Sequence, residues 1–88
     1  MATRTLRATR MVELRREFWR DMREARAGFM PKRVRDTTKT RTGGRQQPTR
    51  PATQNEYPAD VRMAFVDWVD AQARAGAITD SLADRATL

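Results

Sequence analysis

The sequence has neither cysteine nor histidine among its 88 residues, and Ser81 is its single serine. These absences exclude disulfides, zinc sites with Cys or His ligands, and catalysis by a cysteine or a histidine. Ser81 also lacks a histidine that could activate it as a nucleophile. We therefore expect no enzymatic activity, no cofactor and no bound metal.

Long hydrophobic runs are missing as well. No stretch of about 18 apolar residues could span a bilayer, and the N-terminus lacks the uninterrupted apolar core of a secretory signal. We expect a protein that is neither transmembrane nor secreted. The predicted location is intracellular (cytoplasmic) or within a virus particle.

Apolar side chains are absent from residues 35–51, RDTTKTRTGGRQQPTRP, where no Ala, Val, Ile, Leu, Met or aromatic residue occurs. Such a segment cannot recover its ordering entropy by burial, which favours an open arm or an arm that lies on a partner.

Acidic residues are scarce in the N-terminal part of the chain. Residues 1–50 carry fifteen Lys or Arg against five Asp or Glu, whereas residues 51–88 carry three against six.

This excess of cations predicts contact with an anionic surface, and nucleic acid bound without sequence specificity is the partner that we expect. Arginine suits the role because its guanidinium makes bidentate contacts to phosphate. The residues that we assign to nucleic-acid or anionic-surface binding are Lys32, Arg33, Arg35, Lys39, Arg41, Arg45 and Arg50.

Apolar residues recur every three or four positions from about residue 6 to residue 27, which predicts an amphipathic basic helix. Gly28 and Pro31 are expected to end it. The carboxylates on this helix alternate with arginines, which is typical of an ion-paired face rather than a metal site. The residues of the stripe that we expect to dock on a partner protein are Met11, Leu14, Phe18, Trp19 and Met22.

A second helix is predicted from Pro58, whose missing N–H costs nothing in a first turn, to a stop at Gly76. Thr79 is expected to cap a short third helix that folds back on the second. No alternating apolar pattern predicts a strand. The residues of this region assigned to protein docking are Phe65, Trp68, Val69 and Leu82.

Residues 76–88, GAITDSLADRATL, resemble the first half of a helix-turn-helix in winged-helix regulators. The resemblance implies a scaffold helix, but we expect no recognition helix after it, and Asp80 and Asp84 are unsuited to face phosphate. We interpret this segment as a structural helix.

Together these patterns predict an all-α chain that is not an independent globular domain. Its expected parts are a long basic amphipathic helix (residues 1–30), an extended basic arm rich in Pro, Gly, Thr and Arg (31–56), and a small C-terminal helical hairpin (57–88). Pieces this short rarely fold without a staple or a partner.

The predicted function is that of a small, non-enzymatic, basic structural component of a larger protein assembly, such as a minor component of a virus-like particle or a ribonucleoprotein. Apolar helix faces would dock it, and the arm would lie along protein or nucleic acid. One alternative is a small dimeric DNA- or RNA-binding regulator, so a homo-oligomer stays open. A second is a peripheral binder of a membrane surface, which the acids of the first helix disfavour.

Overall fold

The computed structural model describes residues 6–38 and 48–88, and all structural statements refer to these two ranges. Their regular structure consists of three α-helices, a short 3₁₀ helix and a two-stranded antiparallel sheet, and about 53% of these residues are helical. The elements in chain order are α1 (Met11–Glu24), β1 (Arg33–Arg35), β2 (Thr49–Pro51), the 3₁₀ helix η1 (Gln54–Glu56), α2 (Ala59–Arg74) and α3 (Asp80–Arg85).

The all-α prediction with an extended arm is wrong, because the two ends of the arm pair with each other. Hydrogen bonds from Asp36 N–H to the Pro48 carbonyl (2.8 Å) and from Ala52 N–H to the Lys32 carbonyl (2.9 Å) prolong the ladder. Residues 39–47, which join the strands, lie outside the described residues. The register places Arg33 opposite Pro51, Val34 opposite Arg50 and Arg35 opposite Thr49.

The first helix begins at Met11, five residues later than the apolar periodicity suggested. The Glu13 carboxylate accepts hydrogen bonds from the Arg10 N–H (3.1 Å) and the Thr9 hydroxyl (3.0 Å). A carboxylate at this position satisfies donors that the first turn leaves free. The start of α1 is therefore set by a cap, which the periodicity did not reveal.

The end of α1 is a left-handed turn at Arg26, where φ is 54°. The Ala27 N–H bonds the Met22 carbonyl (3.0 Å) and the Arg26 N–H bonds the Arg23 carbonyl (3.1 Å). This is the Schellman pattern, which usually has glycine at the left-handed position. Gly28, which the sequence suggested as the stop, lies two residues beyond it.

The helices α2 and α3 lie close to their predicted positions. Pro58 directly precedes the first residue of α2. Gly76, with φ 72°, closes its end, where the Ala77 N–H bonds the Gln72 carbonyl at 2.9 Å. The Thr79 hydroxyl caps α3 by accepting a hydrogen bond from the Leu82 N–H at 3.2 Å.

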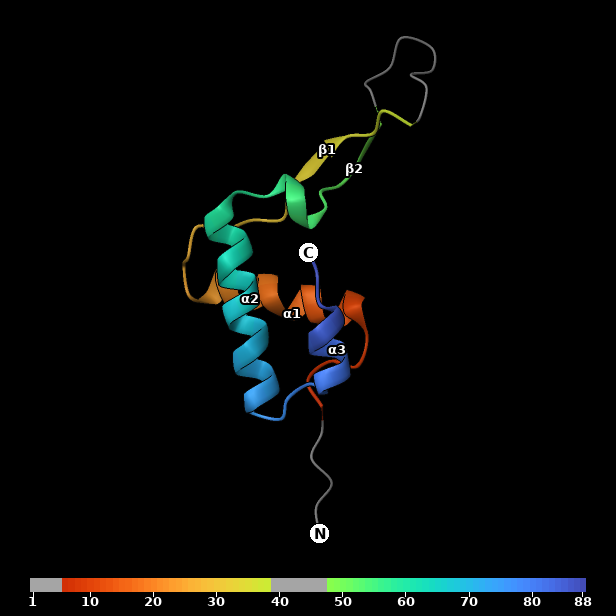
Figure 1. Ribbon diagram of the computed structural model, residues 1–88. Helices are drawn as coiled ribbons and strands as arrows, with labels where there is room; N and C mark the ends of the chain where they lie inside the picture. The colour runs from red at the N-terminus through yellow and green to blue at the C-terminus, as the bar shows by residue number, and fades with distance from the viewer. Residues whose placement is uncertain (1–5, 39–47) are drawn as a thin grey trace.

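One hydrophobic core joins all parts of the described chain, which corrects the expectation of a chain without a globular domain of its own. α1 crosses behind α2 and α3 (Figure 1). Phe18 of α1 is fully buried at the crossing. Its ring centroid lies 5.1 Å from Phe65 and 5.5 Å from Trp68, both in edge-to-face geometry, an arrangement that aromatic pairs favour.

A polar network centred on Arg7 ties the segment before α1 to this crossing. The Arg7 guanidinium donates to Asp21 of α1 and to Gln72 Oε1 of α2 (3.2 Å), and lies 5.5 Å from the centre of the Trp68 ring. The Trp68 Nε1–H donates to the other Asp21 oxygen (2.9 Å). Burial opposes ionisation of Asp21, but hydrogen bonds from Arg7 and Trp68 outweigh it, so its pKa is lowered. The network thus holds a charged pair on the edge of the core.

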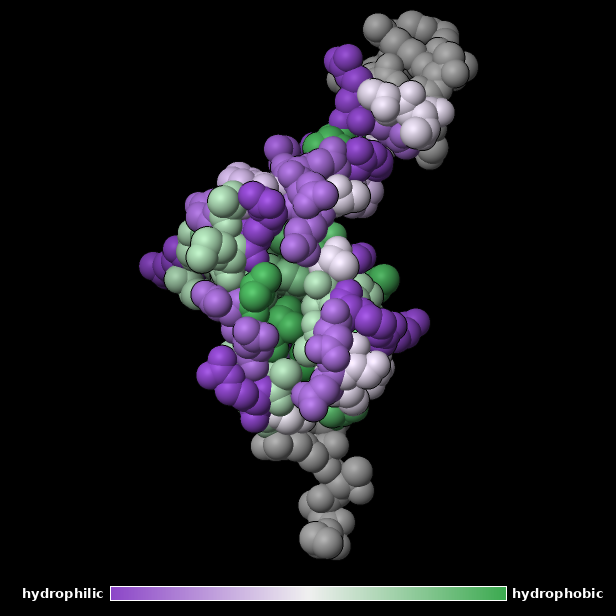
Figure 2. Space-filling model, in the orientation of Figure 1, coloured by the Kyte–Doolittle hydropathy of each residue, from purple (hydrophilic) through white to green (hydrophobic). Residues whose placement is uncertain are grey.

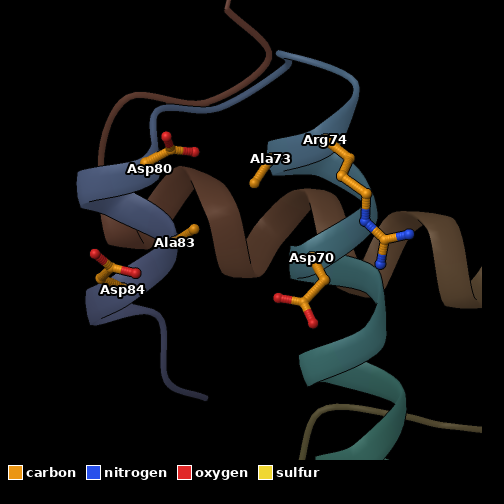
Figure 3. A pocket seen from close by; sticks show the side chains of 6 residues that line it. All are labelled: Asp70, Ala73, Arg74, Asp80, Ala83 and Asp84. Atoms are coloured by element: carbon orange, nitrogen blue, oxygen red, sulfur yellow. The ribbon is translucent and has the colours of Figure 1, made fainter.

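The surface between α2 and α3 is a groove with alanines at its centre and charged borders, on which three aspartates outnumber one arginine, Arg74. Figure 2 shows apolar side chains along the centre of this face with polar ones on either side. A hollow of about 530 Å³ lies between Asp70 of α2 and Asp80 and Asp84 of α3, and Ala73 and Ala83 face each other across it (Figure 3). The small side chains let the two helices approach, and the carboxylates remain in solvent.

Two residues of α1 provide a matched test of the core. Leu14 is fully buried, whereas Val12 is 60% exposed. We expect Leu14→Ala to lower the free energy of unfolding by about 2–5 kcal/mol, because it removes buried surface and leaves a cavity. Val12→Ala should change it by less than about 0.5 kcal/mol. Urea unfolding followed by circular dichroism measures both, and equal effects of the two changes would contradict this core.

Candidate nucleic-acid interface

The outward face of the hairpin carries arginines because side chains alternate along a strand. Val34 is half-buried and packs against the core, so Arg33 and Arg35 on either side of it point to solvent. The hairpin projects from the helical body (Figure 1). Arg33 donates hydrogen bonds to Thr49 Oγ1 (3.0 Å) and to its carbonyl (2.8 Å) across the ladder. Arg35 is exposed and has no hydrogen bond or ion pair within the two described ranges.

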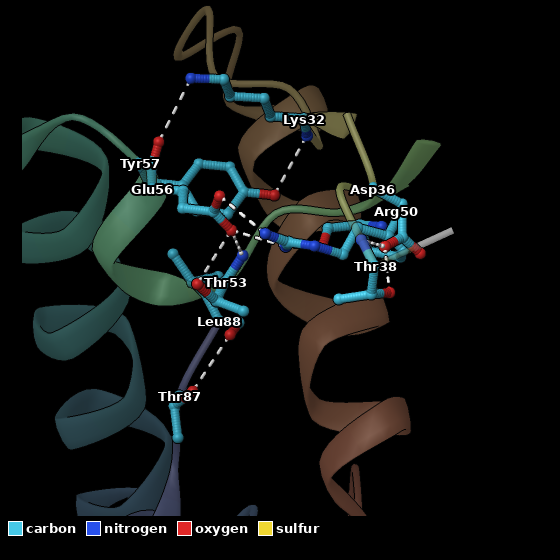
Figure 4. A network of polar contacts seen from close by, with 10 residues as sticks. Lys32, Asp36, Thr38, Arg50, Thr53, Glu56, Tyr57, Thr87 and Leu88 are labelled. Carbon is cyan, nitrogen blue, oxygen red and sulfur yellow. Dashed lines mark hydrogen bonds and ion pairs between the residues drawn. The ribbon is translucent and has the colours of Figure 1, made fainter. Parts of the chain in front are cut away.

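Tyr57 fastens the base of the hairpin to the body. Its hydroxyl accepts a hydrogen bond from the Lys32 N–H (3.0 Å), directly before β1 (Figure 4). Its side chain is buried, and its ring lies 5.5 Å from that of Trp19 on α1. The Lys32 ammonium also donates to the Glu56 carbonyl (3.2 Å). The direction in which the hairpin leaves the body is therefore linked to the aromatic core.

A second fastening joins Arg50 of β2 to Glu56 of η1. The guanidinium makes two hydrogen bonds to the carboxylate, of 2.7 and 3.0 Å, which is the strong bidentate geometry. One carboxylate oxygen also accepts from the Thr53 N–H (2.9 Å) and hydroxyl (3.0 Å), so Glu56 caps η1 as well. The hydrogen bond from Arg50, helped by those from Thr53, lowers the pKa of Glu56 from 4.5 to about 2.

Asp36 is the single acid in the arm segment 31–50, and it is only 6% exposed. Its carboxylate accepts hydrogen bonds from the Thr38 N–H and hydroxyl. The hydrogen bond to Glu56 is the main influence that raises the pKa of Arg50, and the charge of Asp36, which acts inside the hairpin, is a further one.

The structure divides the predicted basic site into three groups. Arg33 and Arg35 share the outward face of β1. Lys32 and Arg50 are engaged at the base of the hairpin, so they position it rather than face a partner. The three cations that lie outside the described residues are Lys39, Arg41 and Arg45.

The residues assigned to protein docking all belong to or border the internal core. Whether a partner contacts any of them stays a prediction, but their side chains face the inside of this chain. Three are half-buried against the core, namely Met11, Trp19 and Met22. The buried ones are Leu14, Phe18, Phe65, Trp68, Val69 and Leu82.

Sequence reasoning missed three residues that build this interface and its support. Glu56 had a readable signal, since Thr53 and Glu56 have the spacing of a capping box. Tyr57 and Arg7 had no such signal, because their partners are distant in the sequence. Lys32 lies 25 residues from Tyr57, and Gln72 lies 65 residues from Arg7. Long-range pairing of this kind leaves no local periodicity.

The described part of the chain holds no group of three or more His, Cys, Asp or Glu side chains that could bind a metal ion. It also has no helix that is both long and apolar enough to cross a bilayer.

Comparisons with known proteins assign this chain to no family. No protein-family model matches it, and neither a curated protein nor a solved structure does.

The Arg50–Glu56 pair generates a pH prediction. Because the pKa of Glu56 is lower in the folded chain than the ordinary 4.5, the pair stabilises the fold above pH 4.5, and this contribution is lost as the pH falls toward about 2. Melting temperatures of the natural protein and of Glu56→Gln, measured from pH 7 to pH 2, should converge at the acid end. A difference that stays constant over this range would contradict the assignment.

Proposed function

We propose that this protein is a small, non-enzymatic component of a nucleic-acid-containing assembly, and that its hairpin binds the phosphate backbone. The observation that carries the proposal is the outward arginine face of a hairpin fastened to a folded body at Tyr57 and Glu56. An interior location, in a cell or a virus particle where nucleic acid is present, is part of this proposal.

Charge distribution supports the choice of partner. The chain has a formal net charge of +7, and its solvent-facing carboxylates at Asp70, Asp80 and Asp84 line a groove of the helical body. The hairpin can therefore approach phosphates while these acids stay on the helical body, away from the contact. Lys39, Arg41 and Arg45 belong to the same arm in sequence and would add to the attraction.

The proposed binding depends on charge and not on base sequence. Guanidinium contacts to phosphate fix position and carry no base information by themselves. The strands of the hairpin have only three residues each. The one residue between Arg33 and Arg35 is Val34, whose side chain packs against the core and is not presented to bases. We therefore expect similar affinity for unrelated sequences and a steep dependence on salt.

Arg35→Gln tests the proposal most cleanly, because the Arg35 side chain has no hydrogen bond or ion pair in the described ranges and its loss should leave the fold intact. Arg74→Gln is the matched control, since Arg74 is also exposed, carries the same charge and lies at the end of α2 remote from the hairpin (Figure 1). Fluorescence anisotropy with two unrelated labelled oligonucleotides measures the affinity. Repeating it from about 50 to about 300 mM salt, a range that includes physiological ionic strength, gives the slope of log affinity against log salt concentration. We expect Arg35→Gln to reduce the log–log slope by about 1 and Arg74→Gln to leave it nearly unchanged.

Two results would reject the proposal. One is equal loss of affinity in the two variants, which would mean that total charge and not the hairpin decides binding. The other is a large preference for one sequence that survives high salt, which would favour a regulator that reads bases.

A further inference from the structure

The surface of the helical body has a second basic feature, which lies away from the hairpin's outward arginines. A groove of about 470 Å³ runs past the end of α1, with Trp19, Met22, Phe29 and Met30 among its apolar walls and Arg23 and Arg26 on its border. We call it the arginine-bordered groove. Met30 is 77% exposed, the highest value among the large apolar side chains described as exposed. Neither arginine side chain has a hydrogen bond or an ion pair within residues 6–38 and 48–88.

Arg26 occupies a position that its own helix end does not favour. The left-handed conformation, with φ 54°, costs a residue with a Cβ more than it costs glycine. Arg23 in the last turn of α1 suits the helix dipole, but Arg26 lies beyond that turn. The turn that ends α1 at Arg26 thus places a second cation beside Arg23 on the border of the groove.

The complementary surface lies on α2 of the same chain. Met63 and Val66 are 66% and 49% exposed, and with Asp67 they border a hollow of about 420 Å³. Asp70 follows one turn later on the same helix. We call Met63, Val66, Asp67 and Asp70 the α2 stripe.

The charged side chains of the α2 stripe lack ion-pair partners within the described residues, as those of the arginine-bordered groove do. Neither Asp67 nor Asp70 has an ion pair or a side-chain hydrogen bond in the described ranges. Arg62, which borders the same hollow, keeps a buried Nε without an acceptor there. Exposed apolar side chains grouped in a hollow with polar borders mark interaction surfaces.

We propose that the arginine-bordered groove of one copy binds the α2 stripe of a second copy. Met63 and Val66 would cover the apolar walls of the groove, and Asp67 and Asp70 would pair with Arg23 and Arg26. The two contacting surfaces differ, so each copy can bind one neighbour through its groove and another through its stripe. The inference goes beyond nucleic-acid binding and does not depend on it, because none of these residues belongs to the hairpin.

Charge exchange tests this contact in the full-length protein without nucleic acid. Arg23→Glu with Arg26→Glu makes the groove acidic, and Asp67→Lys with Asp70→Lys makes the stripe basic. In either variant alone, like charges meet, and we expect self-association to weaken by about a hundredfold or more. In an equimolar mixture, each groove again meets a stripe of opposite charge, so association should return. Sedimentation equilibrium over a range of concentrations measures all four samples.

A second pair of variants guards against an effect of charge exchange on folding. Met30→Ser and Val66→Ser each remove an exposed apolar side chain, one from each surface, and should weaken association without loss of helicity by circular dichroism. Val12→Ser is the control, since Val12 is also exposed, at 60%, but borders neither surface. A natural protein that stays monomeric up to about 1 mM, where specific binding energy is small, would overturn the proposal. Association that survives both charge exchanges, or a mixture that fails to associate, would overturn it as well.

Discussion

The crossing of α1 over α2 at Phe18 is the contact on which the other parts of the structure depend. α2 also packs against α3, with Leu82 of α3 in the same core, but the contact with α1 is made at one ring, because Phe18 meets Phe65, Trp68 and Trp19 at once. Aromatic side chains bury a large area each, which matters in a chain too short for an extensive core. The Arg7 network then surrounds the same point, because Asp21 and Trp68 are hydrogen-bonded partners across the crossing. Packing and polar contacts thus fix one relative orientation of the two helices.

The position of the hairpin follows from this crossing through two short links. Trp19, next to Phe18 on α1, contacts Tyr57, and Tyr57 accepts the hydrogen bond from Lys32 before β1. Arg50 and Glu56 bind the second strand to the residues that lead into α2. The arginines that face outward are therefore presented by a supported hairpin, and the cations engaged at its base serve that support. This arrangement relates the proposed phosphate contact to the core without requiring any catalytic group.

The sequence predicted the parts of the fold that local signals encode and missed those that depend on distant partners. Pro58 and Gly76 predicted the two ends of α2, and Thr79 predicted the start of α3, because caps and stops act within a few residues. The hairpin was missed because its strands have three residues each, too few for an alternating pattern to be recognised. The outward arginines were identified by composition alone. Composition could not tell Arg35, whose side chain has no ion pair in residues 6–38 and 48–88, from Arg50, which is bound to Glu56. That distinction needs the register of the ladder.

The central claim is that the free chain folds around Phe18 and carries a paired hairpin. Nuclear magnetic resonance of the isolated protein tests it most directly, through proton contacts that report distances below about 5 Å, the range over which rings and paired strands meet. The account predicts contacts from the Phe18 ring to Phe65 and Trp68, and cross-strand contacts between Val34 and Arg50, without nucleic acid or any partner. Narrow amide dispersion with none of these contacts, and order only after a partner is added, would contradict it.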